Sequence, residues 1–339
     1  MNCIKYLLAF FLTCSLCCCE DIIVKSENDE NNLADFEKAW QGINAVYPYF
    51  EIKNIDWDQI YQKYRPTAEA AKGDEIYTVL VDLLAELKDQ HPYIEFLGGR
   101  QVNVYLSPRY IRDKELYNPV VVKKYFDKEF FIAGGGFIEY QVLPDNIGYI
   151  NISSFTPPQL TNDFQTILNY FANTKGVIID VRHNMGGSAD NSNRFLAYLI
   201  SSDFPVPEAY SNHQLIPQEP IKPNGYKFSK PIVVLINGVS YSEAERFTVM
   251  MTQLENVTSV GDTTGGGSAG SNGVRDEILL PSGRIVHVGT IDFRRYDGKP
   301  WEWIGIEPDI RITNSKENLR KSIDNQLEYA IGLLKLADR

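Results

Sequence analysis

From residue 146 onward, short apolar runs alternate with longer amphipathic segments, and this alternation constrains the fold more than any other feature. Two of the runs, 176–181 and 231–236, are rich in valine and isoleucine and are bounded by polar turn residues. Largely apolar runs of this length are typical of strands that are covered on both faces. Strands that alternate with helices predict an α/β core with a largely parallel sheet. The helices of this core are expected at 160–173, 191–201, 241–254 and 316–336.

The segment 33–100 has a helical pattern. A second amphipathic run in it, 55–64, is expected to end at Pro66, because proline interrupts the hydrogen bonding of a helix. Asp74 is expected to cap a third helix that ends shortly before His91. The first helix is indicated by four aromatic and aliphatic residues at helical spacing, namely Phe36, Trp40, Ile43 and Tyr47.

All five cysteines lie within the first 19 residues. The rest of the chain therefore can hold neither a disulfide, nor a thiol nucleophile, nor a cysteine-ligated metal. The same segment has a lysine followed by a short apolar run, which is typical of a signal peptide. It ends in Leu16-Cys17-Cys18-Cys19, which resembles the lipid-attachment motif of bacterial lipoproteins, and polar residues follow at once. Cys19 is the expected lipidation site, with Cys17, Cys18 or a plain cleaved signal peptide as alternatives.

Composition limits the possible partners. Hydrophobic residues make up 44% of the chain, which is typical of a globular protein and unlike a disordered or multi-span membrane chain. The formal net charge is −11, so nucleic acid is not an expected partner, because phosphate backbones require a basic surface. The expected organisation is a signal peptide at 1–18, an acidic tether at 19–32, a helical domain at 33–100, a β-rich connection at 101–145 that includes a strand at 120–122, and an α/β core with a C-terminal helix at 146–339.

Two motifs follow the two most apolar strands, at the edge of the sheet where ligands bind in α/β folds. After the first strand, Gly186 and Gly187 could present backbone N–H groups to an anion, or form only a turn. After the second strand, Ser240 or Ser242 could act as a nucleophile at a strand-to-helix turn. Either serine could instead cap the helix, with Glu243 or Glu245 completing a capping box.

Taken together, the two motifs resemble the serine peptidase family of the C-terminal processing (tail-specific) proteases and the tricorn core. The sequence Asp180-Val-Arg-His-Asn-Met-Gly186-Gly187 is similar to the family's Asp-Leu-Arg-x-Asn-x-Gly-Gly. Ser242 with Glu245 is similar to its Ser-x-x-Glu, and the Gly261-Asp-Thr-Thr264 turn follows Ser242 at the family's spacing. The resemblance therefore implies that Ser242, rather than Ser240, is the nucleophile.

The resemblance also separates two branches of the family. The processing-protease branch has a lysine as general base where this chain has Gly267. The tricorn-like branch has a histidine from the helical region and a late glutamate. His91, in Leu87-Lys-Asp-Gln-His91, and Glu302, in Glu302-Trp-Ile-Gly-Ile-Glu-Pro-Asp309, are similar to these two motifs. The chain is therefore expected to belong to the tricorn-like branch, with Gln90 as a polar neighbour of the base.

The resemblance implies a crotonase/ClpP-like β-α-β core with an N-terminal helical domain. It also implies an acyl-enzyme on Ser242, with His91 as base, Glu302 as the residue that orients it, and no metal or cofactor. The N–H groups of Gly186 or Gly187 and of Glu243 would form the oxyanion hole. The 101–145 stretch is too short for the PDZ module of many processing proteases.

The expected function is that of a serine endopeptidase that cuts unfolded or C-terminal polypeptide segments. It would be held by a lipid anchor in the cell envelope of a bacterium, facing the periplasm or at the cell surface. The alternative is a non-catalytic lipoprotein that binds a ligand or peptide on the same fold.

Overall fold

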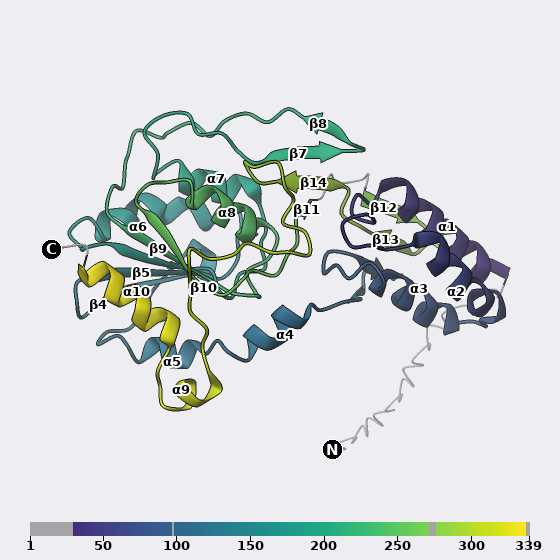
Figure 1. Cartoon of the computed structure of the whole chain (residues 1–339), viewed down its shortest axis with the longest axis horizontal. Helices are drawn as coiled ribbons and strands as arrows, with labels where there is room; N and C mark the ends of the chain where they lie inside the picture. Colours follow the sequence, from purple (N-terminus) through teal and green to yellow (C-terminus); the bar gives the residue numbers. More distant parts are fainter. Residues whose placement is uncertain (1–29, 97, 271–275, 337–339) are drawn as a thin grey trace, which may run out of the picture.

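A seven-stranded sheet lies at the centre of the larger part of the molecule (Figure 1). The computed structural model describes residues 30–96, 98–270 and 276–336. In the sheet, β5, β6, β9, β10 and β15 are parallel, and β4 and β3 add an antiparallel edge, so the predicted α/β core is confirmed. The strand order is β15 (Ile310–Arg311), β10 (Val257–Gly261), β9 (Ile232–Ile236), β6 (Val177–Asp180), β5 (Ile147–Ile152), β4 (Ile138–Leu143) and β3 (Phe131–Ala133).

Helices cover both faces of this sheet, which explains why its central strands are largely apolar. On one face, Val177, Ile179 and Val234 pack in a core with α6 (Phe164–Tyr170), α7 (Ala189–Leu196) and α8 (Glu243–Met251). On the other face, Ile178, Val233 and Leu235 pack against α10 (Asn325–Leu336). Two short helices complete this region, η2 (Leu160–Asp163) before α6 and α9 (Lys316–Arg320) before α10.

The N-terminal helices form a separate layer on the right of Figure 1. They are α1 (Glu30–Val46), α2 (Trp57–Ala70) and α3 (Glu75–Ala85). Pro66 lies inside α2, so the prediction that it ends this helix is wrong. A proline inside a helix costs about 3 kcal/mol, and the burial of Ala68 and Ala71 after it favours the continued helix. α1 begins within the segment expected to be a tether, whereas the expected signal peptide and Cys19 lie outside the described residues.

A hairpin from late in the chain completes the hydrophobic core of this helical layer. The hairpin consists of β12 (Glu277–Leu279) and β13 (Ile285–His287), and it joins β1 (Tyr93–Glu95) and β2 (Gln101–Asn103) in the order β12-β13-β1-β2. Ile278 and Val286 pack in one cluster with Leu80 and Leu83 of α3. The structure also contains a third sheet. Its strands, in order, are β11 (Ala269–Gly270), β14 (Ile291–Arg294), β7 (Glu208–Ser211) and β8 (Gln214–Ile216).

The stretch 101–145 differs from the expected β-rich connection. It contains α4 (Pro108–Lys114), α5 (Pro119–Lys123) and the short η1 (Gly134–Gly136), while β3 and β4 belong to the core sheet. The expected strand at 120–122 is therefore wrong. Asn118 accepts a hydrogen bond from the backbone N–H of Val120, and Pro119 occupies the first helical position, which together start a helix. Within the described ranges, no helix is both long and apolar enough to cross a membrane.

Candidate active site

Ser242 lies at the turn between β9 and α8, in a backbone conformation that is unusual for serine. Its φ is +55° and its ψ is −121°. Backbone of this kind is costly outside glycine and is concentrated at functional sites. The turn is held because the backbone N–H of Ser242 donates to the Glu245 carboxylate at 3.0 Å. Ser242 lines a cavity of about 260 Å³ together with His91, Gly187 and Glu243.

Ser240, the competing nucleophile, is fully buried two residues earlier. Its hydroxyl donates to the carbonyl oxygen of Val181 at 2.8 Å and accepts from the N–H of Asn237 at 3.1 Å. Both bonds hold the turn between the two strand ends together. Of the two serines, Ser242 is the one that lines the cavity.

The glycine turn after β6 packs directly against the Ser242 turn. A Cβ atom on Gly186 would lie 2.8 Å from both the Cβ of Ser242 and the nitrogen of Glu243, so only glycine fits there. The Gly186 N–H already donates to Asn184 Oδ1 at 2.7 Å. Among the described residues, the N–H groups of Gly187 and Glu243 have no hydrogen-bond partner. These two groups are therefore the available donors for an oxyanion.

His91 lies just beyond α3 and is held by two side chains. Its Nδ1 atom is 3.0 Å from Asp89 Oδ1 and 3.1 Å from the hydroxyl of Tyr241. A carboxylate can only accept, so the hydrogen-bond network assigns the ring proton to Nδ1. Nε2 is then an acceptor, and it is enclosed without a partner in the described part of the chain. The histidine is thus fixed in the tautomer that a general base requires.

The charges around His91 favour its protonated form. Burial alone lowers the pKa of His91, but its hydrogen bond to Asp89 and the negative charge of that carboxylate outweigh burial and raise the pKa above its usual value. Burial raises the pKa of Asp89. The nearby charges of Lys53 and His91 outweigh burial and hold this pKa well below its usual range. Asp89 is therefore ionised at neutral pH.

Glu302, which was predicted to orient His91, makes no hydrogen bond to it among the described residues, although its charge raises the pKa of His91. One Glu302 oxygen accepts from the backbone N–H of Ser268 at 2.7 Å, and the other lies 2.6 Å from the ammonium of Lys53. Asp89 is the carboxylate that is hydrogen-bonded to His91 in the described structure. The reason is local, because a side chain two residues before the histidine reaches the ring within one turn. Its sequence signal was the Asp in the Leu-x-Asp-x-His motif.

Glu245 organises the loop that faces the Ser242 turn. Besides Ser242, its carboxylate accepts from the N–H groups of Gly266 and Gly267 and from the hydroxyl of Thr264, at 2.5–2.8 Å. Burial raises the pKa of Glu245 to about 7, although these donors lower it. The ring of Tyr241 packs on Gly267, where an added Cβ would lie 2.0 Å from Tyr241 Cζ. The position at which the other branch carries its lysine is thus covered by a tyrosine ring.

The side chains of Gln90 and Glu243 are bonded to groups other than Ser242 and His91. Gln90 accepts from the N–H of Ser107 at 3.0 Å and lines a neighbouring cavity of about 270 Å³ with Tyr241 and Trp303. Glu243 forms an ion pair of 2.8 Å with Arg246. Gln90 thus contacts Tyr241 only through its backbone N–H, and Glu243 offers the cavity its backbone N–H.

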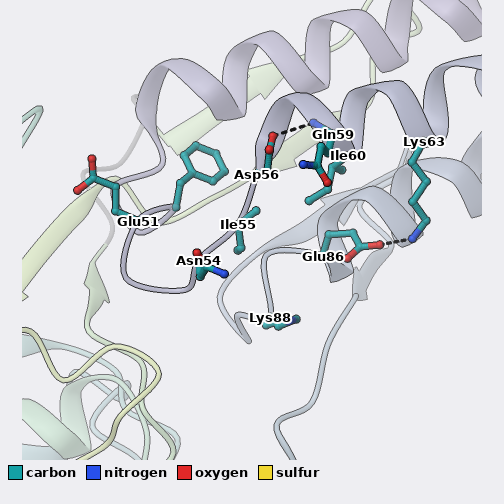
Figure 2. A pocket seen from close by; sticks show the side chains of 10 residues that line it. Glu51, Asn54, Ile55, Asp56, Gln59, Ile60, Lys63, Glu86 and Lys88 are labelled. Carbon is teal, nitrogen blue, oxygen red and sulfur yellow. Dashed lines mark hydrogen bonds and ion pairs between the residues drawn. The ribbon is translucent and has the colours of Figure 1, made fainter.

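A hollow of about 730 Å³, larger than the cavity at Ser242, lies in the helical layer. Figure 2 shows it beside α2, with the Lys63–Glu86 ion pair on one wall and the Asp56–Gln59 helix cap on another. None of the candidate catalytic residues lines it. Within the described residues, no group of three or more histidine and acidic side chains is placed to hold a metal ion.

The fold and the cavity define an α/β protein with the parts that a serine hydrolase requires: a hydroxyl on a strained turn, an oriented imidazole and two free N–H donors. The model of peptidase family S41 matches residues 146–312, and that of the tricorn protease C1 domain matches residues 29–85. The chain belongs to this family of C-terminal processing proteases and the tricorn protease.

Individual relatives agree with this assignment. The chain is 27% identical to the tricorn protease of Thermoplasma volcanium over 79% of its own length, and 29% identical to the carboxy-terminal processing protease CtpA of Bacillus subtilis over 49%. It spans only 24% and 35% of the lengths of these two proteins. A crystal structure of a candidate peptidase from Parabacteroides merdae has a TM-score of 0.78 at 27% identity, covering 91% of this chain and 96% of that one.

Proposed function

We propose that this protein is a serine peptidase of the tricorn-like branch that hydrolyses peptide bonds through an acyl-enzyme on Ser242. The observation that carries the proposal is the cavity in which Ser242, the unpaired Nε2 side of His91 and the free N–H groups of Gly187 and Glu243 meet. Membership in a peptidase family supports the same reaction class.

In the proposed reaction, His91 Nε2 takes the hydroxyl proton as Ser242 Oγ attacks the carbonyl carbon of the scissile bond. The oxygen of the tetrahedral intermediate accepts from Gly187 and Glu243. The imidazolium, stabilised by Asp89, then returns its proton to the leaving amine, and the C–N bond breaks. A water molecule then attacks the ester carbonyl carbon while His91 takes its proton. His91 returns this proton to Ser242 Oγ as the ester C–O bond breaks and the acid product leaves.

We further propose that the substrates are unfolded or C-terminal polypeptide segments and that a lipid on Cys19 holds the protein in a bacterial cell envelope. The cavity of about 260 Å³ at Ser242 is too small for a folded domain, which supports a substrate that enters as an extended segment. Metabolic labelling with a radioactive fatty acid tests the anchor: label is expected in the wild type and lost in Cys19→Ala. Retention of the label in Cys19→Ala would move the anchor to Cys17 or Cys18.

The test of the reaction is hydrolysis of unfolded casein by the purified protein. Ser242→Ala is expected to reduce the rate by about 10³-fold or more, because the acyl-enzyme cannot form. Ser202→Ala, at an exposed position in the loop after α7, should keep the wild-type rate and serves as the matched control. Equal rates for the wild type and Ser242→Ala would refute the proposal and favour a binding protein on the same fold.

A further inference from the structure

Lys53 is a buried lysine whose ammonium lies among the groups behind His91. It comes from the loop between α1 and α2, and its side chain has no exposed surface. Its Nζ atom lies 2.6 Å from Glu302 Oε1 and 3.7 Å from Asp89 Oδ2. It also donates to the hydroxyl of Tyr47 at 2.6 Å, and that hydroxyl donates to Asp89 at 2.9 Å.

The same ammonium holds the chain that leads to His91. It donates to the carbonyl oxygen of Leu87 at 3.0 Å and to that of Lys88 at 3.4 Å. These carbonyls lie just beyond the C-terminus of α3, where a cation is favoured. Lys88 has a φ of +49°, so the chain turns sharply there before Asp89. One buried side chain thus fixes both the turn and the carboxylate that orients the histidine.

The charge balance of this region depends on Lys53. Asp89 and Glu302 are both buried, and burial of two neighbouring carboxylates is strongly unfavourable without a cation. Burial and the charge of Asp89 raise the pKa of Glu302, and Lys53 opposes this shift. Lys53 does not line the Ser242 cavity, so it cannot touch a substrate there.

We infer that Lys53 is a positioning residue of this active site: it holds the Asp89 carboxylate and the turn before it in place, and its charge offsets Glu302, so that His91 can act as a base near neutral pH. This inference rests on the proposed function and extends it to the helical layer. The groups that act on His91 are Asp89, Tyr241, Glu302 and Glu245. Lys53 lies against Asp89 and Glu302, and Arg246 lines the same cavity as His91.

Lys53→Met tests the inference, because methionine keeps the length of the side chain and removes its charge. Without the cation, the two carboxylates stabilise the imidazolium more strongly. The pH at which kcat/KM reaches half its plateau should then rise by about one unit. The kcat should fall about tenfold or more, with KM changed less than about threefold, because the cavity itself is untouched. Lys63→Met, which removes an exposed ion pair of the same layer, should change neither value.

A second variant separates charge from packing. In Lys53→Met/Glu302→Gln, one carboxylate is also neutralised, so the pH midpoint should return toward the wild-type value and the melting temperature should exceed that of Lys53→Met. A double variant with a melting temperature equal to or below that of Lys53→Met, including the case in which neither folds, would overturn the inference.

NMR titration of the His91 ring provides a readout that does not need activity. The His91 signal, assigned by its loss in His91→Asn, should titrate at a higher pH in Lys53→Met than in the wild type. If no variant hydrolyses casein, the proposed function fails, and this titration still decides the role of Lys53. A folded Lys53→Met protein with the wild-type His91 pKa and wild-type pH midpoint would refute the role.

Discussion

At the scale of single residues, the partner of His91 decides which ring nitrogen can act as a base. Asp89 accepts a hydrogen bond from the Nδ1–H group, which leaves Nε2 without a partner on the side of the cavity. Tyr241 donates a second hydrogen bond to the same carboxylate at 3.0 Å. The motif that contains His91 was recognisable in the sequence, but the role of its aspartate was not. The pairing of Glu302 with Lys53 had no sequence signal, because it joins residues far apart in the chain.

Asp89→Asn should therefore be much more damaging than Glu302→Gln. The amide can donate to Nδ1 and favour the wrong tautomer, so kcat is expected to fall by about 10²–10⁴-fold. Glu302→Gln keeps an acceptor for the N–H of Ser268, and its kcat should stay within about tenfold of the wild type. Steady-state kinetics on one peptide substrate compares the two. A larger loss in Glu302→Gln would restore Glu302 as the orienting residue.

The pH dependence of activity follows from the same contact. The pKa of His91 is raised in the folded protein, and only the neutral ring can accept the serine proton. Activity should therefore be low in acid and rise with pH through a midpoint above about 6.5, the usual histidine value. A pH profile of kcat/KM in buffers of constant ionic strength measures this midpoint. A midpoint clearly below pH 6 would show that Asp89 does not act on the ring as described.

At the scale of elements, the candidate site is formed by the turns that follow β6 and β9 and by the start of α8. The sequence predicted the central strands well, because apolar runs of five or six residues have few alternatives in an α/β protein. The sequence-based prediction was wrong at positions where the preference of single residues differs from what the surrounding structure favours. The valines at 120–122 form part of α5 because Asn118 and Pro119 start a helix, and α2 continues through Pro66. Such outcomes depend on contacts that a local pattern does not contain.

Gly267→Ala tests how closely the loop packs on the Ser242 turn. The added methyl group would overlap the ring of Tyr241, which would have to leave His91 and Asp89. We expect a loss of about 1–3 kcal/mol in the free energy of unfolding and at least a tenfold loss of kcat. Gly332→Ala in α10 is the control: nothing lies near its added methyl, so stability should rise by about 0.5–1 kcal/mol. Denaturant unfolding and peptide hydrolysis measure both variants. Wild-type activity in Gly267→Ala would mean that Tyr241 is not needed.

At the scale of the whole molecule, the N-terminal helical layer contributes residues to the candidate active site. It supplies His91, Asp89 and Lys53, and the late hairpin β12–β13 is buried in its core. The helical segment predicted at 33–100 therefore shares a hydrophobic core with a hairpin from the segment predicted as the α/β core. The packing of this hairpin on the helices had no local sequence signal, because its partners lie about 200 residues earlier in the chain.

Ile278→Ala tests whether the β12–β13 hairpin and the N-terminal helices share one hydrophobic core. Ile278 is 7% exposed and packs in the helical core, so truncation should cost about 2–5 kcal/mol. Leu279→Ala is a matched control on the other face of the same strand, where the side chain is 63% exposed, and should cost less than about 0.5 kcal/mol. Urea unfolding measures both variants. If both variants lost less than about 0.5 kcal/mol of unfolding free energy, the claim that the hairpin and the helices share one core would be contradicted.

The central claim is that Ser242 is the nucleophile of this molecule. Mass spectrometry of the protein after reaction with a fluorophosphonate tests it most directly, because the probe forms a covalent bond only with an activated serine. The account predicts one adduct, on Ser242, that disappears in His91→Asn and Ser242→Ala. An adduct on Ser240, or casein hydrolysis by a protein that takes up no label at Ser242, would contradict it.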